Sequence, residues 1–156
     1  MIRSLPLLLL VLGSGTVRLD AQGRPLVVSG VRSLVFGAVF PGVPRVISRT
    51  DPANSGQFDL TGNKNGQALL TFTLPLVMTG PVGATMPLSF GGADAGYSST
   101  QAIGSQVAFD PSQPFLATLN KNGRGSVFIG GTAQPGTSQR AGPYTGTLTL
   151  TVAYFP

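Results

Sequence analysis

The clearest pattern in the chain is an alternation of residue types over residues 144–155. Even-numbered positions carry mainly apolar side chains, and odd-numbered positions carry mainly threonines. A period of two with β-branched residues predicts one long, half-buried antiparallel strand. At roughly 3.3 Å per residue this strand would extend about 40 Å. Its apolar face is formed by Tyr144, Gly146, Leu148, Leu150, Val152 and Tyr154.

Other strand-like segments follow one another at regular spacing, separated by stretches rich in Gly, Pro, Asn, Asp and Ser. No helical pattern of convincing length occurs after residue 21. This organisation predicts an all-β protein, an antiparallel immunoglobulin-like β-sandwich with two sheets packed face to face. The expected strands are residues 25–29, 33–40, 45–50, 56–61, 67–75, 86–90, 106–109, 115–119, 125–130 and 144–155.

The expected strand at residues 67–75 sets Leu70, Phe72 and Leu74 on one face. We expect this face to pack against the face of the last strand that carries Leu148, Leu150 and Val152. Residues 91–105 are small and polar, and they predict a surface loop.

The tetrapeptide Asn-Lys-Asn-Gly occurs twice, at residues 63–66 and 120–123. Each copy precedes a strand and ends in Asn-Gly, the pair that best adopts the positive φ angles of a tight hairpin turn. A pair of ligand-binding loops is the alternative interpretation. The glycine pair at residues 130–131 lies inside a strand-like run, and there we expect a β-bulge.

The first residues predict an export signal. Arg3 provides the positive start, residues 5–12 form an apolar run, and Ala21 offers a small residue at the cleavage point. The apolar run is too short to span a bilayer, so we expect no membrane anchor. The predicted organisation is a cleaved signal peptide at residues 1–21, an N-terminal extension at residues 22–32, and a secreted β-sandwich domain at residues 33–156.

The composition and net charge of the chain limit the kinds of molecule that it is expected to bind. Charged residues make up only 10% of the chain, and cleavage of the signal lowers the formal net charge from +5 to +4, because two positive residues and one negative residue are lost. The remaining basic residues are scattered and form no tract, which disfavours nucleic-acid binding. Solubility explains them, with adhesion to acidic polymers as the alternative. They are Arg24, Arg32, Arg45, Arg49, Lys64, Lys121, Arg124 and Arg140.

The chain offers little material for catalysis. It contains no histidine and no cysteine, so His/Cys metal sites, thiolate chemistry and disulfides are excluded. The only carboxylates after the signal are Asp51, Asp59, Asp94 and Asp110, which we interpret as turn and cap residues. We therefore expect no enzymatic activity, no cofactor and no metal.

The N-terminal extension is a candidate for strand complementation. It is extended in character, and Leu26, Val28 and Gly30 alternate along it. Such an arm either folds back onto its own domain or adds as a strand to a neighbouring molecule. Head-to-tail addition need not close on itself, so it would generate a fibre.

Three short motifs resemble a known family. They are Leu-Val-Phe-Gly at residues 34–37 followed by Pro41-Gly42, Phe-Ile-Gly-Gly-Thr at residues 128–132, and the ending that starts at residue 141. They resemble secreted bacterial fimbria-associated domains, which are similar to the pilin subunits of chaperone–usher pili and to spore-coat-like secreted β-sandwiches. The resemblance implies an assembly strand at residues 144–154 and a donor arm at residues 22–32. It also implies a periplasmic chaperone and an outer-membrane usher as partners.

Together these features favour a structural subunit of an extracellular fibre or pilus, a homopolymer for adhesion or biofilm. The alternative is a self-contained secreted β-sandwich that binds carbohydrate or a cell surface. The residues expected to mediate polymerisation are Leu26, Val28, Gly30, Tyr144, Leu148, Leu150, Val152 and Tyr154.

Overall fold

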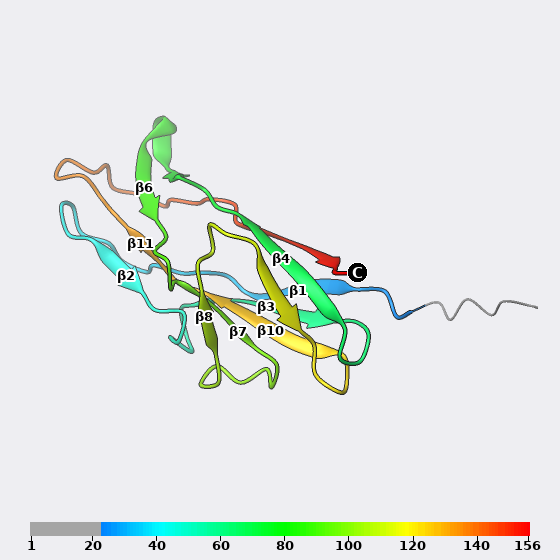
Figure 1. Cartoon of the computed structure of the whole chain (residues 1–156). Coiled ribbons are helices and arrows are strands. Elements are labelled where there is room, and N and C mark those ends of the chain that lie inside the picture. The colour runs from blue at the N-terminus through cyan, green and yellow to red at the C-terminus, as the bar shows by residue number, and fades with distance from the viewer. Residues whose placement is uncertain (1–22) are drawn as a thin grey trace, which may run out of the picture.

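The computed structural model describes residues 23–156 and is built almost entirely from antiparallel strands (Figure 1). The expected signal peptide and Gln22 lie outside the described residues. The strands are β1 (Val27–Arg32), β2 (Arg45–Ile47), β3 (Gly56–Thr61), β4 (Gln67–Thr73), β5 (Val77–Thr79), β6 (Thr85–Ser89), β7 (Ala95–Ser98), β8 (Val107–Phe109), β9 (Phe115–Thr118), β10 (Arg124–Ile129), β11 (Gly131–Ala133) and β12 (Thr149–Tyr154). A single 3-10 turn, Pro81–Gly83, separates β5 from β6.

Two sheets pack face to face over the main core. The larger has the order β1-β3-β10-β7-β8, and the smaller has the order β12-β4-β9. Leu60, Val127 and Ile129 of the larger sheet meet Leu70 and other buried residues of the smaller one. This arrangement confirms the expected antiparallel β-sandwich.

A third sheet, with the order β2-β11-β6-β5, extends the sandwich at one end over a second small core. Strand β11 follows β10 after one residue, Gly130. A side chain at Gly130 would collide with the carbonyl oxygen of Ile47 and would lie 2.7 Å from the amide nitrogen of Arg49. Glycine is therefore required because the backbone crosses close to another chain segment where it changes sheets, rather than because of the expected bulge.

Several predicted strands are confirmed, and β3 has the expected bounds. The prediction of a strand at residues 33–40 was wrong. In the described chain this segment runs extended without a ladder, apart from one hydrogen bond from the Val35 amide to the Asn54 carbonyl at 2.9 Å. Gly37 has a φ angle of 65°, which interrupts the extended conformation.

The last strand is shorter than its alternating pattern predicts. Strand β12 begins at Thr149, because its partner β4 ends at Thr73, shortly before Pro75. Proline cannot donate to a ladder, so the pairing stops there. The apolar positions Leu150 and Val152 lie opposite Phe72 and Leu70 within one sheet. The expected face-to-face packing of these two strands was therefore wrong, and they are lateral neighbours.

Residues 91–105 contain a strand that we expected to be a loop. All four residues of β7 are buried, and β7 lies between β10 and β8 in the larger sheet. Its sequence is Ala-Gly-Tyr-Ser. Three of the four side chains are small or absent, and all four residues are buried, so the sequence shows no alternation that would predict this strand.

The two Asn-Lys-Asn-Gly segments do not form hairpins as predicted. The first joins β3 to β4 and the second joins β9 to β10, and each crosses from one sheet to the other. Positive φ angles do occur, at Asn65 (54°) and at Gly123 (74°). The turn chemistry was thus anticipated, but the topology was not.

Candidate functional site

The N-terminal arm, residues 23–32, folds onto its own chain. Strand β1 pairs with β3 in antiparallel register, with a shift between Gly30 and Arg32. Leu26 and Val28 are partly buried against the main core, while Gly30 is exposed. The opposite edge of β1 pairs with no strand among the described residues.

The start of the arm is held by a clasp formed by Tyr154 and Asn63. The Tyr154 hydroxyl donates to the Arg24 carbonyl oxygen at 2.6 Å and accepts from the Asn63 amide at 2.6 Å. The Asn63 side-chain oxygen accepts from the Arg24 amide at 2.6 Å. These hydrogen bonds connect the arm to the last strand and to the first Asn-Lys-Asn-Gly turn.

Replacement of Tyr154 by phenylalanine is expected to loosen the arm. The variant loses both hydroxyl hydrogen bonds, which lowers the free energy of unfolding of the arm by about 1–2 kcal/mol. Hydrogen exchange of the β1 amides should accelerate roughly tenfold, because 1.4 kcal/mol is a factor of ten. The control is Tyr144→Phe, which also removes two hydroxyl hydrogen bonds but far from the arm. If the β1 amides exchange hydrogen equally fast in both variants, the Tyr154 hydroxyl does not hold the arm in place.

Two chain segments border an open edge of the sandwich. Ladder pairing of β12 starts at Thr149, and further upstream only Thr145 bridges to Thr79. Residues 146–148 therefore pair with no strand of the described chain. Across from them run residues 33–36, which also lie outside every ladder. Neither segment belongs to a ladder of the described chain, although the Val35 amide is bonded to the Asn54 carbonyl.

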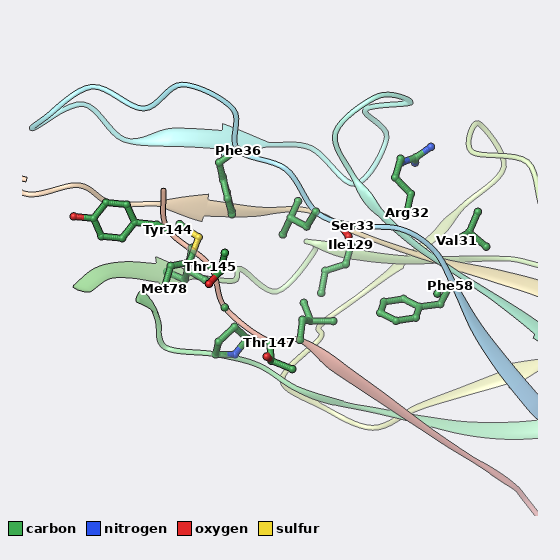
Figure 2. A pocket seen from close by; sticks show the side chains of 17 residues that line it. Val31, Arg32, Ser33, Phe36, Phe58, Met78, Ile129, Tyr144, Thr145 and Thr147 are labelled. Carbon is green, nitrogen blue, oxygen red and sulfur yellow. The ribbon is translucent and has the colours of Figure 1, made fainter. Parts of the chain in front are cut away.

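An apolar groove lies between these segments, and we call it the edge groove. One part, with a cavity volume of about 570 Å³, is bordered by residues 30–34, Phe36 and residues 144–148. A second part of about 600 Å³ shares Leu34, Phe36, Met78 and Tyr144 with the first and extends it along residues 37–41 and 139–143. Figure 2 shows Phe36, Met78 and Ile129 around the first part, whereas Arg32 points away from it.

The wall of the groove at Tyr144 is well fixed. The Tyr144 hydroxyl donates to the Arg140 carbonyl oxygen at 2.8 Å and accepts from the Gln139 side chain at 2.6 Å. Its ring covers Gly80, where an added side chain would lie 2.5 Å from the ring. The groove is therefore a feature of a packed scaffold and not a gap between loose segments.

The predicted polymerisation residues fall into two sets. Gly30, Tyr144 and Leu148 line the edge groove. The remaining five lie outside it, because β1 and β12 are already paired with β3 and β4. These five are Leu26, Val28, Leu150, Val152 and Tyr154.

Sequence reasoning missed the groove floor. Phe36, Met78 and Ile129 come from a non-ladder segment, a short strand and a central strand, respectively. No spacing along the chain connects them. The only available signal was that the apolar alternation continues through Tyr144 and Leu148 into a stretch with no obvious partner.

Three of the aspartates serve local structure, as expected. Asp51 accepts hydrogen bonds from the Ala53 and Asn54 amides, and Asp94 accepts one from the Gly91 amide at 2.6 Å. Asp110 accepts from the amide and hydroxyl of Ser112. The Asn54 side chain, helped by the backbone, lowers the pKa of Asp51, and Ser112 lowers the pKa of Asp110.

Asp59 differs from the other three because it lies within β3 rather than in a turn. Its carboxylate accepts from the Ser126 hydroxyl at 2.6 Å and from the Gln57 side chain at 3.1 Å. Burial raises the pKa of Tyr97 to about 12, and the Tyr97 hydroxyl donates to the Thr118 carbonyl. The Asp59 contacts lie within the larger sheet, whereas the Tyr97 hydrogen bond joins the larger sheet to β9 of the smaller one.

Over residues 23–156, no three acidic, histidine or cysteine side chains gather closely enough to hold a metal ion. The same part of the chain has no helix with the length and apolar character needed to cross a bilayer. The feature that distinguishes the surface is the edge groove.

The molecule is thus an antiparallel β-sandwich with an apolar groove between two extended segments that belong to no ladder within residues 23–156. Residues 10–154 match the family described as domain of unknown function (DUF4402), and the chain belongs to that family. No curated protein matches the sequence.

Proposed function

We propose that this protein is a structural subunit of an extracellular fibre, and that the edge groove of each copy accepts the N-terminal arm of a neighbouring copy. The observation that carries the proposal is the apolar groove, which is bordered on each side by an extended segment outside every ladder of the described chain. An added strand gains backbone hydrogen bonds from such edges and specificity from side-chain pockets.

The direction of the backbone groups supports strand addition at residues 146–148. The amide and carbonyl of Thr145 both bond to Thr79, at 3.0 and 2.8 Å, so they point toward β5. In an extended chain, neighbouring residues present these groups on opposite sides. The corresponding groups of Gly146 and Leu148 therefore point toward the groove.

The arm has the character that the groove requires. Its alternating side chains at Leu26 and Val28 are apolar and of medium size. Within residues 23–156 the arm pairs along one edge only, with β3. In the edge groove of a neighbour it would have a backbone segment on each side and an apolar floor below, which favours exchange of the arm between copies.

The geometry also favours a chain of subunits over a closed pair. The start of the arm lies at the same end of the sandwich as the C-terminus, whereas β2 and β6 lie at the other end (Figure 1). The second part of the groove is lined by Met86 of β6 and by residues that precede β2, so the groove extends away from the start of the arm. Donor and acceptor are therefore different surfaces, and their contact is head to tail. Negative-stain microscopy of residues 22–156 tests this directly: we expect fibres, and a population of single particles at every concentration would contradict the proposal.

Replacement of Gly146 by proline is expected to block fibre growth without unfolding the subunit. Gly146 has no positive φ angle and lies outside every ladder, so the monomer loses no backbone hydrogen bond. An incoming strand, however, loses a donor at the groove wall, as edge prolines prevent strand addition. The expected result is a fall of at least about tenfold in elongation rate, equivalent to roughly 1.4 kcal/mol.

The matched control is Gly146→Ala. An added Cβ there would lie 3.4 Å from Met78, which is ordinary contact, and the amide donor is retained. We expect the alanine variant to elongate like the wild type and both variants to melt within about 1 kcal/mol of it. Equal elongation of the proline and alanine variants would show that no strand adds at this wall.

A further inference from the structure

The two Asn-Lys-Asn-Gly turns lie side by side at one end of the sandwich and brace one another. The Gly62 amide donates to the Gly123 carbonyl at 2.8 Å, and the Asn65 amide donates to the Asn120 carbonyl at 3.0 Å. A third bond runs from the Leu119 amide to the Gly66 carbonyl at 2.9 Å. The two turns, which begin at residues 63 and 120, are thereby fixed as one rigid surface.

This docking brings together basic residues that are scattered in the sequence. Lys64 and Lys121 occupy equivalent positions in the two turns, and Arg124 follows the second turn and pairs with Thr61. Arg24 joins them because its backbone bonds to Asn63 of the first turn. All four side chains are exposed. They are half of the basic residues that remain after the signal, and we call them the basic tip.

The carboxylates are placed elsewhere. Asp51, Asp94 and Asp110 belong to turns that precede β3, β7 and β9, where their oxygens are occupied by local hydrogen bonds. Asp59 is the carboxylate closest to the basic tip along β3, two residues before Thr61. Its oxygens accept hydrogen bonds from Ser126 and Gln57. The tip therefore carries a local excess of positive charge that attracts polyanions.

We propose that the basic tip binds an acidic polysaccharide, that is, a sugar chain carrying carboxylate or sulfate groups. Two exposed aromatic rings, Tyr154 at 37% and Phe155 at 47% exposure, border the tip and offer apolar faces to sugar rings. The Tyr154 ring is rigidly placed, because its hydroxyl is held by Asn63 and Arg24. This site goes beyond the proposed fibre function, and it is complete in the closed monomer, where Arg24 is held next to Asn63 and Tyr154.

The test is salt-dependent binding of monomeric protein, residues 22–156, to heparin and to alginate. Four engaged cations predict that log affinity falls with log salt with a slope of about −3 to −4. In the double variant Lys64→Gln/Lys121→Gln the slope should fall by about two, with at least about a tenfold loss of affinity at low salt. Lys64→Arg/Lys121→Arg should retain the wild-type binding.

The control Arg45→Gln/Arg140→Gln removes the same charge from exposed positions away from the tip, and it should bind these polysaccharides like the wild type. Absence of wild-type binding overturns the proposal, as does an equal loss in both glutamine variants, which would indicate net charge alone. Binding of duplex DNA as tight as that of heparin overturns the assignment to polysaccharide. Because the assay uses monomers, its result is independent of whether fibres form.

Discussion

Deletion of residues 22–32 is expected to abolish fibres. The deletion removes β1 and the partly buried side chains of Leu26 and Val28, so the shortened subunit has no arm to donate. It also uncovers the edge of β3 and costs roughly 3 kcal/mol of folding free energy from lost burial and ladder bonds. Negative-stain microscopy and size-exclusion chromatography should show monomers or amorphous aggregate, but no filaments.

Addition of a synthetic peptide with the sequence of residues 22–32 separates loss of folding from loss of linkage. The peptide restores the strand next to β3, and the melting temperature should recover. Fibres should remain absent, because the peptide is not covalently joined to any subunit. Filaments of normal length from the deleted protein, with or without the peptide, would refute the donor role of the arm.

The two faces of the arm provide a finer comparison. Leu26→Ser/Val28→Ser changes side chains that pack against the core, whereas Val27→Ser/Val31→Ser changes side chains with 49% and 54% exposure. Strand insertion depends on the side chains that enter pockets. We therefore expect the first pair to prevent assembly and the second to leave it intact.

The sequence predicted the fold class because alternation and turn residues report directly on half-buried strands. It predicted β3 well, since Gly56 and Gly62 bound a clear strand pattern. It failed for β7, whose four residues, Ala-Gly-Tyr-Ser, are all buried and show no alternation. It also overextended the last strand, because alternation reports which face is buried and does not report whether a ladder partner exists.

The residues at which the last strand was predicted too long, 144–148, lie at the proposed site. Tyr144 and Leu148 keep the inward direction of a strand, although the partner strand has already ended. A segment whose side chains are placed for a sheet but whose backbone is unpaired is suited to receive another strand. The floor below it, formed by residues such as Phe36 and Met78, depends on tertiary packing and leaves no local pattern.

A disulfide that locks the arm to its own chain is expected to stop assembly while stabilising the subunit. Val27 and Thr61 are direct partners in β1 and β3, and both are exposed. Facing Cα atoms in antiparallel pairs lie about 4.5–5.5 Å apart, within the range of a disulfide. The chain has no other cysteine, so oxidised Val27→Cys/Thr61→Cys can form only this intramolecular bridge.

The matched control is Thr71→Cys/Thr151→Cys, which bridges β4 and β12 at exposed partner positions and leaves the arm free. Both bridges should stabilise the monomer by roughly 3 kcal/mol. Only the bridge at Val27 should prevent fibres, and reduction should restore them. If the oxidised, arm-locked protein still forms fibres, assembly does not require residues from Val27 onward to leave β3.

The direction of these effects distinguishes strand exchange from a purely structural arm. If the arm only supported its own sandwich, Tyr154→Phe would lower both stability and assembly, and the arm lock would raise both. Exchange requires the arm to leave β3 first, so stability of the closed monomer opposes assembly. Tyr154→Phe should therefore shorten the lag before fibres form, whereas the arm lock abolishes them. If monomer stability and fibre assembly change in the same direction in either variant, exchange of the arm between copies is excluded.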